Sequence, residues 1–209
     1  MGRLFAVLAA IAIAPFHLAI AAAIFFGDRG PVFYRSMRLG QDGRPFEMFK
    51  YRSMQVGCGA RIDDGFKTVV ASDDSRVTAT GRILRCGLDE IPQLLNVIRG
   101  EMAWIGPRPD ELWMLPHYGP EIRQRLRVAP GITGLAQVCG SRDLGTPQVY
   151  ALEIWAARRR TASLMLRIIA MTPLFVLGWR SIGRSLLVRV LANPEVLEIE
   201  RACQRELNP

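Results

Sequence analysis

The sequence predicts a helix-dominated α+β protein attached to a membrane, and three observations lead to this prediction. The 209-residue chain begins with an apolar segment, Leu4 to Phe26, that is long enough to enter a bilayer. Short apolar runs punctuated by glycine and proline follow from Gly27 to about Gly140, as in a domain of short strands and helices. An arginine-rich apolar segment from Trp155 to Ala192 is typical of amphipathic helices at a lipid surface.

The N-terminal segment has three interpretations: a cleaved signal peptide, a full span, or a re-entrant helix that bends and leaves on the same side. The first is disfavoured because the apolar run before Ala21-Ala22-Ala23 is longer than a signal peptide usually has. Pro15 predicts a bend, because proline lacks the backbone donor that a helix interior needs. A kinked span and a re-entrant helix both stay open. The arginines that follow, Arg29, Arg35 and Arg38, place the bulk of the chain on the cytoplasmic side.

The middle of the chain contains a candidate β-hairpin. Val32-Phe33-Tyr34 suits an extended segment, and Gly40-Gln41-Asp42-Gly43 predicts a tight reversal before the alternating segment from Phe46 to Met54.

Asp89 and Glu90 form an adjacent acidic pair with apolar residues on both sides. Acids in the first turn and a nearby proline are typical of a helix start, so capping is one explanation of the segment Asp89-Glu90-Ile91-Pro92. Two acids close in sequence to Arg82 and Arg85 also suit phosphoryl transfer. In that chemistry one carboxylate acts as nucleophile or base, and the other binds Mg²⁺.

Two Gly/Pro segments follow the acidic pair. Gly106-Pro107-Arg108-Pro109 holds an arginine between two prolines, a stiff extended mount that loses little entropy when the guanidinium binds phosphate. Pro130-Gly131-Ile132-Thr133-Gly134 predicts a second turn, either a plain turn or one whose backbone approaches a ligand.

Charge and cysteine usage exclude several classes of function. The net charge is +8, and seven arginines with no acid lie between Trp155 and Ala192, so the excess is local. Arginines interleaved with so much aliphatic material favour anionic lipid headgroups over nucleic acid as the partner, although two buried helices with solvated edges remain an alternative. Four scattered cysteines and two histidines predict neither a zinc cluster nor a disulfide framework, and they favour a reducing compartment.

Five motifs stand in one order along the chain and resemble the bacterial sugar transferase family, the monotopic phosphoglycosyl transferases. They are Gly30-Pro31-Val32-Phe33, the run from Phe49 to Met54, the run from Leu88 to Leu94, Gly106-Pro107-Arg108-Pro109, and the run from Pro130 to Val138. The resemblance covers roughly Leu4 to Ser181. The ordered set is specific, whereas one motif alone would not be.

The resemblance implies that the protein moves a sugar 1-phosphate from a UDP-sugar to a polyprenol (undecaprenyl) phosphate and releases UMP. It implies that Asp89 is the nucleophile that carries the phosphosugar and that Glu90 holds Mg²⁺. Lys50, Arg85 and Arg108 are the implied phosphate-binding cations. Arg85 stands closer to the acidic pair than the usual pattern, so Arg82 is the alternative.

The resemblance also implies a domain organisation. Residues 1–27 are expected to form a re-entrant membrane helix broken at Pro15, and residues 28–192 a cytosol-facing catalytic domain with interfacial helices at the bacterial inner membrane. Residues 193–209 are expected to form a C-terminal tail, and the whole is expected to be the minimal catalytic form. Glu153 stands where the family tends to have Asp, and its role stays open. The alternative function is a catalytically inactive membrane scaffold of the same fold, and downstream glycosyltransferases are candidate partners.

Overall fold

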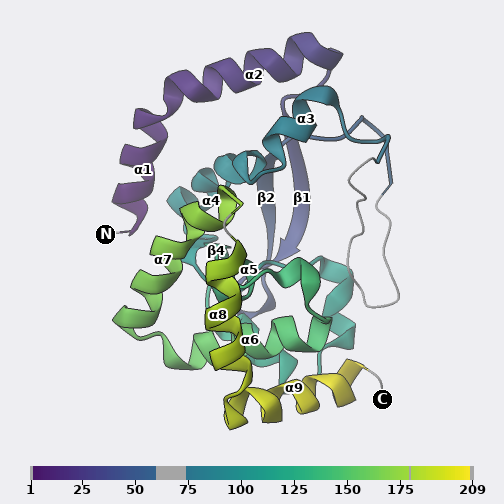
Figure 1. Ribbon diagram of the computed structural model, residues 1–209. Helices are drawn as coiled ribbons and strands as arrows, with labels where there is room; N and C mark the ends of the chain where they lie inside the picture. The colour runs from purple at the N-terminus through teal and green to yellow at the C-terminus, as the bar shows by residue number, and fades with distance from the viewer. Residues whose placement is uncertain (1, 60–73, 179, 208–209) are drawn as a thin grey trace. The chain divides into compact units, whose positions relative to one another are not determined.

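The computed structural model describes residues 2–59, 74–178 and 180–207, without the side chains of residues 28, 142 and 180–184. Helices dominate it, and the strands form two small sheets, β1-β2 and β3-β4 (Figure 1). The expected helix-dominated α+β class is therefore confirmed. The chain divides into two compact units: unit 1 contains Met1–Ser36 and Glu47–Gly100, and unit 2 contains Met37–Phe46 and Glu101–Pro209.

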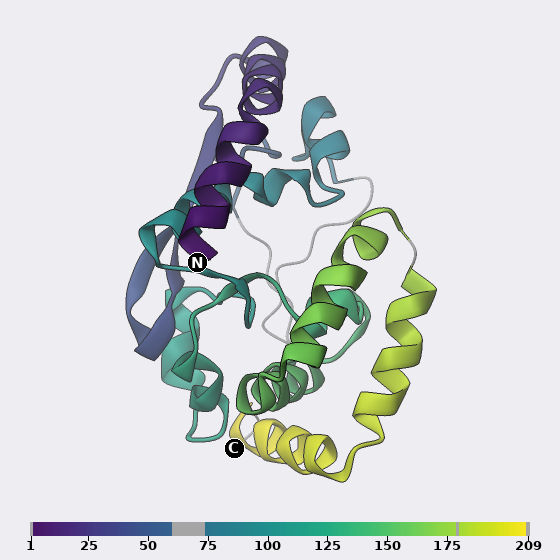
Figure 2. The same ribbon diagram turned by 90° about the vertical axis from the view of Figure 1, so that its left-hand side faces the viewer.

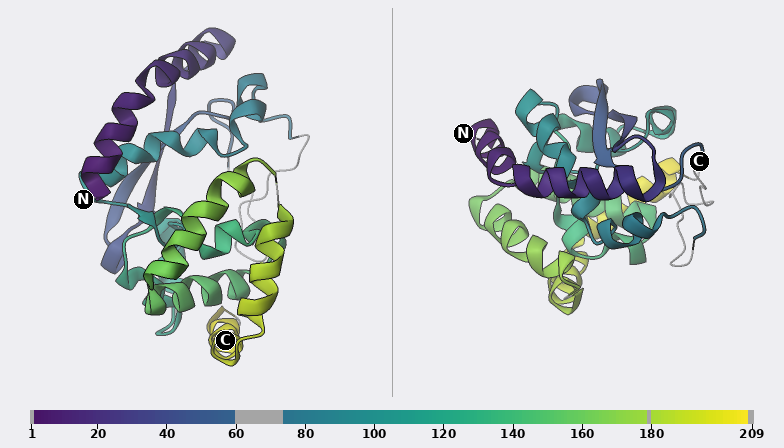
Figure 3. Two further views of the ribbon diagram at one scale, coloured as in Figure 1. Left: turned by 60° about the vertical axis from the view of Figure 1, so that its left-hand side comes forward. Right: turned by 90° about the horizontal axis from the view of Figure 1, so that it is seen from above.

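The N-terminal segment of unit 1 is a bent pair of helices. Helix α1 (Gly2–Ala12) and helix α2 (Ala14–Asp28) meet at Ile13 and differ in direction by 62° (Figures 1 and 3). Pro15 lies in the first turn of α2, where its missing N–H is tolerated. Among the described residues, no single helix is long and apolar enough to cross a membrane, whereas this bent pair is by length and composition.

The predicted hairpin follows α2. Strand β1 (Phe33–Leu39) and strand β2 (Pro45–Tyr51) pair with each other, and the short helix η1 (Gln41–Gly43) forms the reversal between them. After β2 come three short helices that end unit 1: α3 (Ala79–Leu84), η2 (Leu88–Gln93) and α4 (Leu94–Arg99).

One apolar cluster holds the elements of unit 1 together. Ile20 and Ile24 of α2 share a buried core with Tyr51 of β2 and Leu84 of α3. Val32, Leu88 and Ile91 pack against this core and are partly buried. Helix α2 of the bent pair and the short helix η2 therefore rest on the same core.

Unit 2 begins with a short parallel strand pair. Strand β3 (Ala103–Ile105) pairs with strand β4 (Gly131–Thr133), with Ala103 opposite Gly131 and Ile105 opposite Thr133. The sequence predicted a turn at Pro130–Gly134, and the structure instead has this strand there. The difference arises from a long-range partner: the Gly131 N–H donates to the Pro107 carbonyl at 2.9 Å, so the two Gly/Pro motifs bond to each other.

The rest of unit 2 is helical. Its elements are η3 (Leu112–His117), η4 (Ile122–Arg127), α5 (Leu135–Val138), η5 (Ser141–Asp143), α6 (Thr146–Arg159), α7 (Ala162–Val176), α8 (Arg180–Leu191) and α9 (Pro194–Leu207). Helix α6 is the central element and packs against α5, η4 and α9. Helices α7 and α8 pack together and run in opposite directions (Figure 2).

Helix α9 lies within residues 193–209, the segment that the sequence analysis set apart as a tail. It buries Val196, Ile199 and Cys203 and packs on α6. The carboxylate of Glu206 near its end accepts the backbone N–H groups of Glu121 at 2.8 Å and Ile122 at 3.0 Å. These acceptors satisfy donors at the start of η4.

Candidate active site

The acidic pair lies on the short helix η2, and the core beneath that helix sets its orientation. Leu88 and Ile91 flank the pair and pack against the apolar core of unit 1. Since the flanking side chains point toward the core, Asp89 and Glu90 project away from it, and both are half-buried. The helix-start prediction is confirmed in its position, although the first turns are 3₁₀ and α-helical geometry begins at Leu94.

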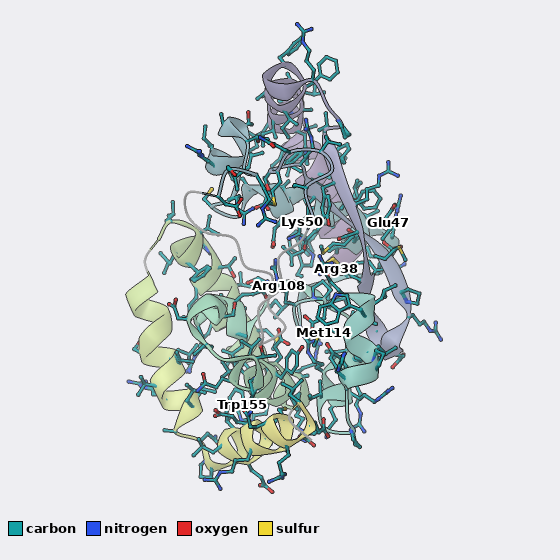
Figure 4. All side chains as sticks on the ribbon, turned by 90° about the vertical axis from the view of Figure 1, so that its right-hand side faces the viewer. Arg38, Glu47, Lys50, Arg108, Met114 and Trp155 are labelled. Carbon is teal, nitrogen blue, oxygen red and sulfur yellow. The ribbon has the colours of Figure 1, made fainter. Side chains whose placement is uncertain are left out.

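Lys50 contacts one member of the pair. Its Nζ lies 2.8 Å from Oε1 of Glu90, and the two side chains are only 15% and 18% exposed. Lys50 and Glu47 are both on β2, where their odd spacing places them on opposite faces, and both are labelled in Figure 4. The strand therefore directs one cation toward the acidic helix.

The buried Asn96 fixes β2 against α4, the helix that directly follows the acidic helix η2. Its Oδ1 accepts the Phe49 N–H at 3.1 Å, and its Nδ2 donates to the Glu47 carbonyl at 2.7 Å. Because Phe49 precedes Lys50 directly, these bonds hold the strand backbone at the position from which Lys50 reaches Glu90. The sequence analysis did not identify Asn96, since nothing local distinguishes an asparagine that bonds to a strand from one on a helix surface.

The arginines before the pair differ in exposure. Arg85 is half-buried and follows α3 directly, whereas Arg82 is exposed on α3. A third arginine of unit 1, Arg52, is 6% exposed and donates through Nε to the Pro31 carbonyl at 2.6 Å. Arg52 therefore has a structural task, in which it holds the loop between α2 and β1.

Tyr51 connects β2 with the bent helix pair. Its hydroxyl is hydrogen-bonded to Nδ1 of His17, and its ring stacks on Phe33 at 5.8 Å. Burial raises the pKa of Tyr51 to about 12, so the phenol is neutral near pH 7. The residues next to one another on β2 thus contact the acidic pair and the second helix of the bent pair.

The donor set fits a magnesium ion that takes most of its ligands from outside the protein. Mg²⁺ in phosphate-transfer sites is usually held by one or two carboxylates together with waters and substrate phosphates. Asp89 and Glu90 supply adjacent half-buried carboxylates of this kind. In the part of the chain that the structure describes, no group of three or more His, Cys, Asp or Glu residues forms a complete metal cage.

Arg108 belongs to unit 2 and is held by its backbone. Pro107 and Pro109 on either side are buried, while Arg108 itself is exposed. The Arg108 N–H donates to Oε1 of Glu153 at 2.9 Å, and Nη2 of Arg125 donates to the Arg108 carbonyl at 2.7 Å. The proline-mounted segment is thus an irregular loop anchored at both backbone groups of its arginine (Figure 4).

Arg125 and Glu153 are the centre of a buried polar cluster. Nε of Arg125 donates to Oε2 of Glu153 at 2.8 Å, and both side chains are 2% exposed. Asp110 accepts from Nη1 of Arg125 and from the hydroxyls of Tyr118 and Tyr150. Such a cluster is stable only when every member is paired, because an unpaired buried charge is costly.

The charges in this cluster shift one another's ionisation. Burial alone would raise the pKa of Asp110, but the Arg125 charge and the two tyrosine hydroxyls outweigh burial and lower it. Burial raises the pKa of Glu153, against the opposing effect of Arg125. The pKa values of Tyr118 and Tyr150 are raised, chiefly by burial.

The structure therefore brings together part of the predicted site. Lys50, Asp89, Glu90 and Arg85 all belong to unit 1, with a direct contact between Lys50 and Glu90. Arg108 is in unit 2, where Glu153 contacts its backbone. Arg125 could not be identified from the sequence, because the run from Arg123 to Arg127 resembles a solvated basic turn.

The described residues combine a half-buried acidic pair, one carboxylate of which pairs with a lysine, with a bent pair of apolar helices. This combination defines a class of protein with a candidate site for phosphate chemistry. The family model "Bacterial sugar transferase" matches residues 1–178. The chain belongs to the bacterial sugar transferase family.

Named relatives support the same assignment. The chain is 39% identical over 191 residues to the UDP-glucose:undecaprenyl-phosphate glucose-1-phosphate transferase of Xanthomonas campestris pv. campestris, a match that covers 86% of this chain and 38% of that protein. It is 40% identical over 156 residues to the exopolysaccharide production protein ExoY of Sinorhizobium fredii, with 68% of each chain covered. It is 43% identical over 140 residues to a Caulobacter vibrioides protein with the same name as the Xanthomonas relative, with 65% of this chain and 51% of that protein covered. The chain thus spans well under two thirds of the length of the Xanthomonas relative.

Proposed function

We propose that the protein transfers a sugar 1-phosphate from a UDP-sugar to a polyprenol phosphate, as the first membrane step of a polysaccharide or glycoconjugate pathway. The observation that carries the proposal is the acidic pair, with Asp89 and Glu90 half-buried and Lys50 2.8 Å from Glu90. Family membership and the printed names of the relatives support this choice of substrates.

In the proposed reaction a carboxylate oxygen of Asp89 attacks the sugar-side phosphorus of the UDP-sugar. The bond from that phosphorus to the bridging oxygen breaks, UMP leaves, and the phosphosugar remains bound to Asp89 as an acyl phosphate. A phosphate oxygen of the polyprenol phosphate then attacks the same phosphorus. This second displacement frees the Asp89 carboxylate and produces a polyprenyl diphosphate sugar.

The other residues supply charge and orientation. Lys50 holds the Glu90 carboxylate in place, and Arg85 and Arg108 are the proposed cations for phosphate oxygens, with Arg82 as the alternative to Arg85. Glu90, with Asp89 beside it, would hold Mg²⁺, which neutralises phosphate charge when bound.

The same proposal places the protein on the cytoplasmic face of the bacterial inner membrane. The bent helix pair exposes a set of large apolar side chains: Leu4, Phe5, Leu8, Ile11, Phe16, Leu18, Phe25 and Phe26. Helix α7 buries Leu164 and Ile168 but exposes Leu166 and Ile169. Exposed apolar surfaces of this extent favour contact with lipid, and the adjacent arginines favour anionic headgroups.

Incubation of the purified protein with polyprenol phosphate, Mg²⁺ and a panel of UDP-sugars tests the proposed activity. UMP release that requires both polyprenol phosphate and one of the UDP-sugars is the expected result. An inactive scaffold of the same fold would release no UMP with any sugar nucleotide, and that result would contradict the proposal.

Glu90→Gln is expected to raise the Mg²⁺ concentration for half-maximal UMP release about tenfold or more, because loss of one group that binds or orients a metal typically costs 10- to 100-fold in affinity. Titration of the rate with Mg²⁺ measures this shift. Glu47→Gln is the matched control, since Glu47 lies on the same hairpin and its carboxylate is 3.8 Å from the Arg35 guanidinium. An unchanged Mg²⁺ requirement in Glu90→Gln would show that Glu90 is not the Mg²⁺ ligand.

Pro15→Ala is expected to convert a re-entrant pair into a straight helix that crosses the bilayer. In a continuous helix alanine donates its N–H to the carbonyl four residues earlier, whereas the proline ring clashes with that carbonyl. A Gly2→Cys reporter, with Cys58 and Cys86 replaced by serine, would then react with an impermeant maleimide from the periplasmic side. With Pro15 present the reporter reacts only from the cytoplasmic side. Pro173→Ala in α7 is the control, and periplasmic labelling with Pro15 present would contradict a re-entrant helix.

A further inference from the structure

We propose that Glu153 and Arg125 are positioning residues for Arg108: together they fix the backbone from which the Arg108 side chain reaches a phosphate group. The inference rests on the proposed function for its ligand, a phosphate oxygen of the sugar nucleotide or the lipid. It assigns a task to Glu153, which the motif comparison left without one, and to Arg125, which the sequence analysis did not identify.

The first step is the geometry of the Arg108 backbone. Glu153 Oε1 accepts the Arg108 N–H at 2.9 Å, and Arg125 Nη2 donates to the Arg108 carbonyl at 2.7 Å. Pro107 and Pro109 are buried on either side and have restricted φ angles. The peptide groups around Arg108 are therefore held while its side chain stays exposed.

The buried cluster around Arg125 includes the Arg108 loop and is more than an internal ion pair. A guanidinium has five N–H donors. For Arg125 the acceptors are Oε2 of Glu153, which bonds to both Nε and Nη2, together with the Asp110 carboxylate, the Tyr118 hydroxyl and the Arg108 carbonyl. All five N–H donors of Arg125 are thus used, and one of their acceptors is the backbone carbonyl of Arg108, the candidate phosphate-binding residue.

Glu153 links the Arg125 guanidinium and the Arg108 loop through different carboxylate oxygens. Its Oε2 accepts from Arg125, and its Oε1 accepts from the Arg108 N–H. Glu153 lies in the middle of α6, the central helix of unit 2, and is 3% exposed. Glu153 therefore fixes the loop to a rigid helix, α6. A fixed loop loses less entropy when Arg108 binds its ligand.

Amide hydrogen exchange tests the positioning without any need for catalysis. Pro107 and Pro109 have no amide hydrogen, so a peptide spanning residues 105–110 reports on Gly106, Arg108 and Asp110. Glu153→Gln is expected to raise exchange in this peptide at least tenfold, with the peptides of α9 unchanged. Glu195→Gln is the control, because the ion pairs of Glu195 run to Arg159 at 2.6 Å and Arg158 at 3.7 Å and involve neither Arg125 nor Arg108. Unaltered exchange in folded Glu153→Gln would overturn the proposal.

Glu153→Asp covers the case in which the amide variant does not fold. The shorter carboxylate keeps a charge for Arg125 but cannot contact both Arg125 and the Arg108 N–H in the same way. Faster exchange at residues 105–110 is again the expected result, and protection equal to that with Glu153 would overturn the proposal.

A double-mutant cycle tests the link to Arg108. Glu153→Gln and Arg108→Ala are each expected to lower kcat/KM for the UDP-sugar at least tenfold, and the double variant is expected to lose no more than Arg108→Ala alone. Losses that multiply would show that Glu153 acts independently of Arg108 and would overturn the proposal. A complete lack of transferase activity with the unaltered chain would refute the proposed function instead, and the exchange result would still decide whether Glu153 holds the loop.

Discussion

Replacement of Asp89 by asparagine is expected to abolish both UMP release and the covalent phosphosugar. Asparagine preserves the size of the side chain on η2, but the amide lacks the anionic oxygen that forms the acyl phosphate. Because the reaction as proposed has no second route through another nucleophile, we expect the rate to fall by at least about four orders of magnitude, as when a covalent nucleophile is removed from other enzymes.

Intact mass spectrometry after incubation with the UDP-sugar measures the covalent intermediate directly. The unaltered protein should gain the mass of one sugar phosphate when polyprenol phosphate is omitted. Asp42→Asn is the matched control, because Asp42 is exposed in the hairpin turn with φ 55°, a conformation that asparagine also tolerates. An adduct on the Asp89→Asn protein would show that another residue is the nucleophile.

The elements that the sequence predicted well depend on local chemistry. The reversal at Gly40–Gly43 forms where Asp42 and Gly43, one after the other, have positive φ angles. The start of η2 lies at Leu88, beside the two acids and Pro92 that indicated a helix start. In each case residues within a few positions of one another determine the backbone.

The elements that the sequence did not predict depend on partners far along the chain. The Pro130–Gly134 segment is a strand because Ala103 to Ile105 lies beside it, and no residue in the segment encodes that neighbour. The buried cluster joins Asp110, Arg125 and Glu153 across separations of 15 and 28 residues. A charged residue on a helix is usually solvated, so its burial becomes visible only when the partners of its charge are known.

The candidate site shows the same division. Asp89 and Glu90 could be identified because the pair has apolar residues on both sides and lies in one of the five motifs that resemble the family. The role of Asn96 could not be identified, because its bonds run to the backbone of β2 from a helix 47 and 49 residues later. Sequence motifs therefore indicate the candidates for the chemistry, and the structure adds the groups that hold these candidates in place.

Gly81→Ala is expected to destabilise the fold severely, although alanine normally stabilises a helix by about 1 kcal/mol relative to glycine. Gly81 lies in α3, and a Cβ there would be 2.0 Å from the Ser53 carbonyl oxygen and 2.7 Å from the Ser53 carbonyl carbon. Those atoms belong to the backbone, which is also bonded to the Thr78 N–H at 3.1 Å, so neither side yields easily.

Overpacking against side chains costs typically 1–3 kcal/mol, and a backbone clash belongs at or above the upper end of that range. For a chain of this size about 3 kcal/mol corresponds to a fall in Tm of roughly 6–12 °C, which thermal unfolding in detergent would measure. Gly59→Ala is the matched control: a Cβ there meets nothing within 4 Å, and its φ is not in the left-handed region, so its Tm should stay the same or rise slightly. An unchanged Tm in Gly81→Ala would mean that α3 does not pack against the Ser53 backbone after β2. Because α3 leads directly to Arg85 and the acidic helix, the position assigned to Arg85 would then also be wrong.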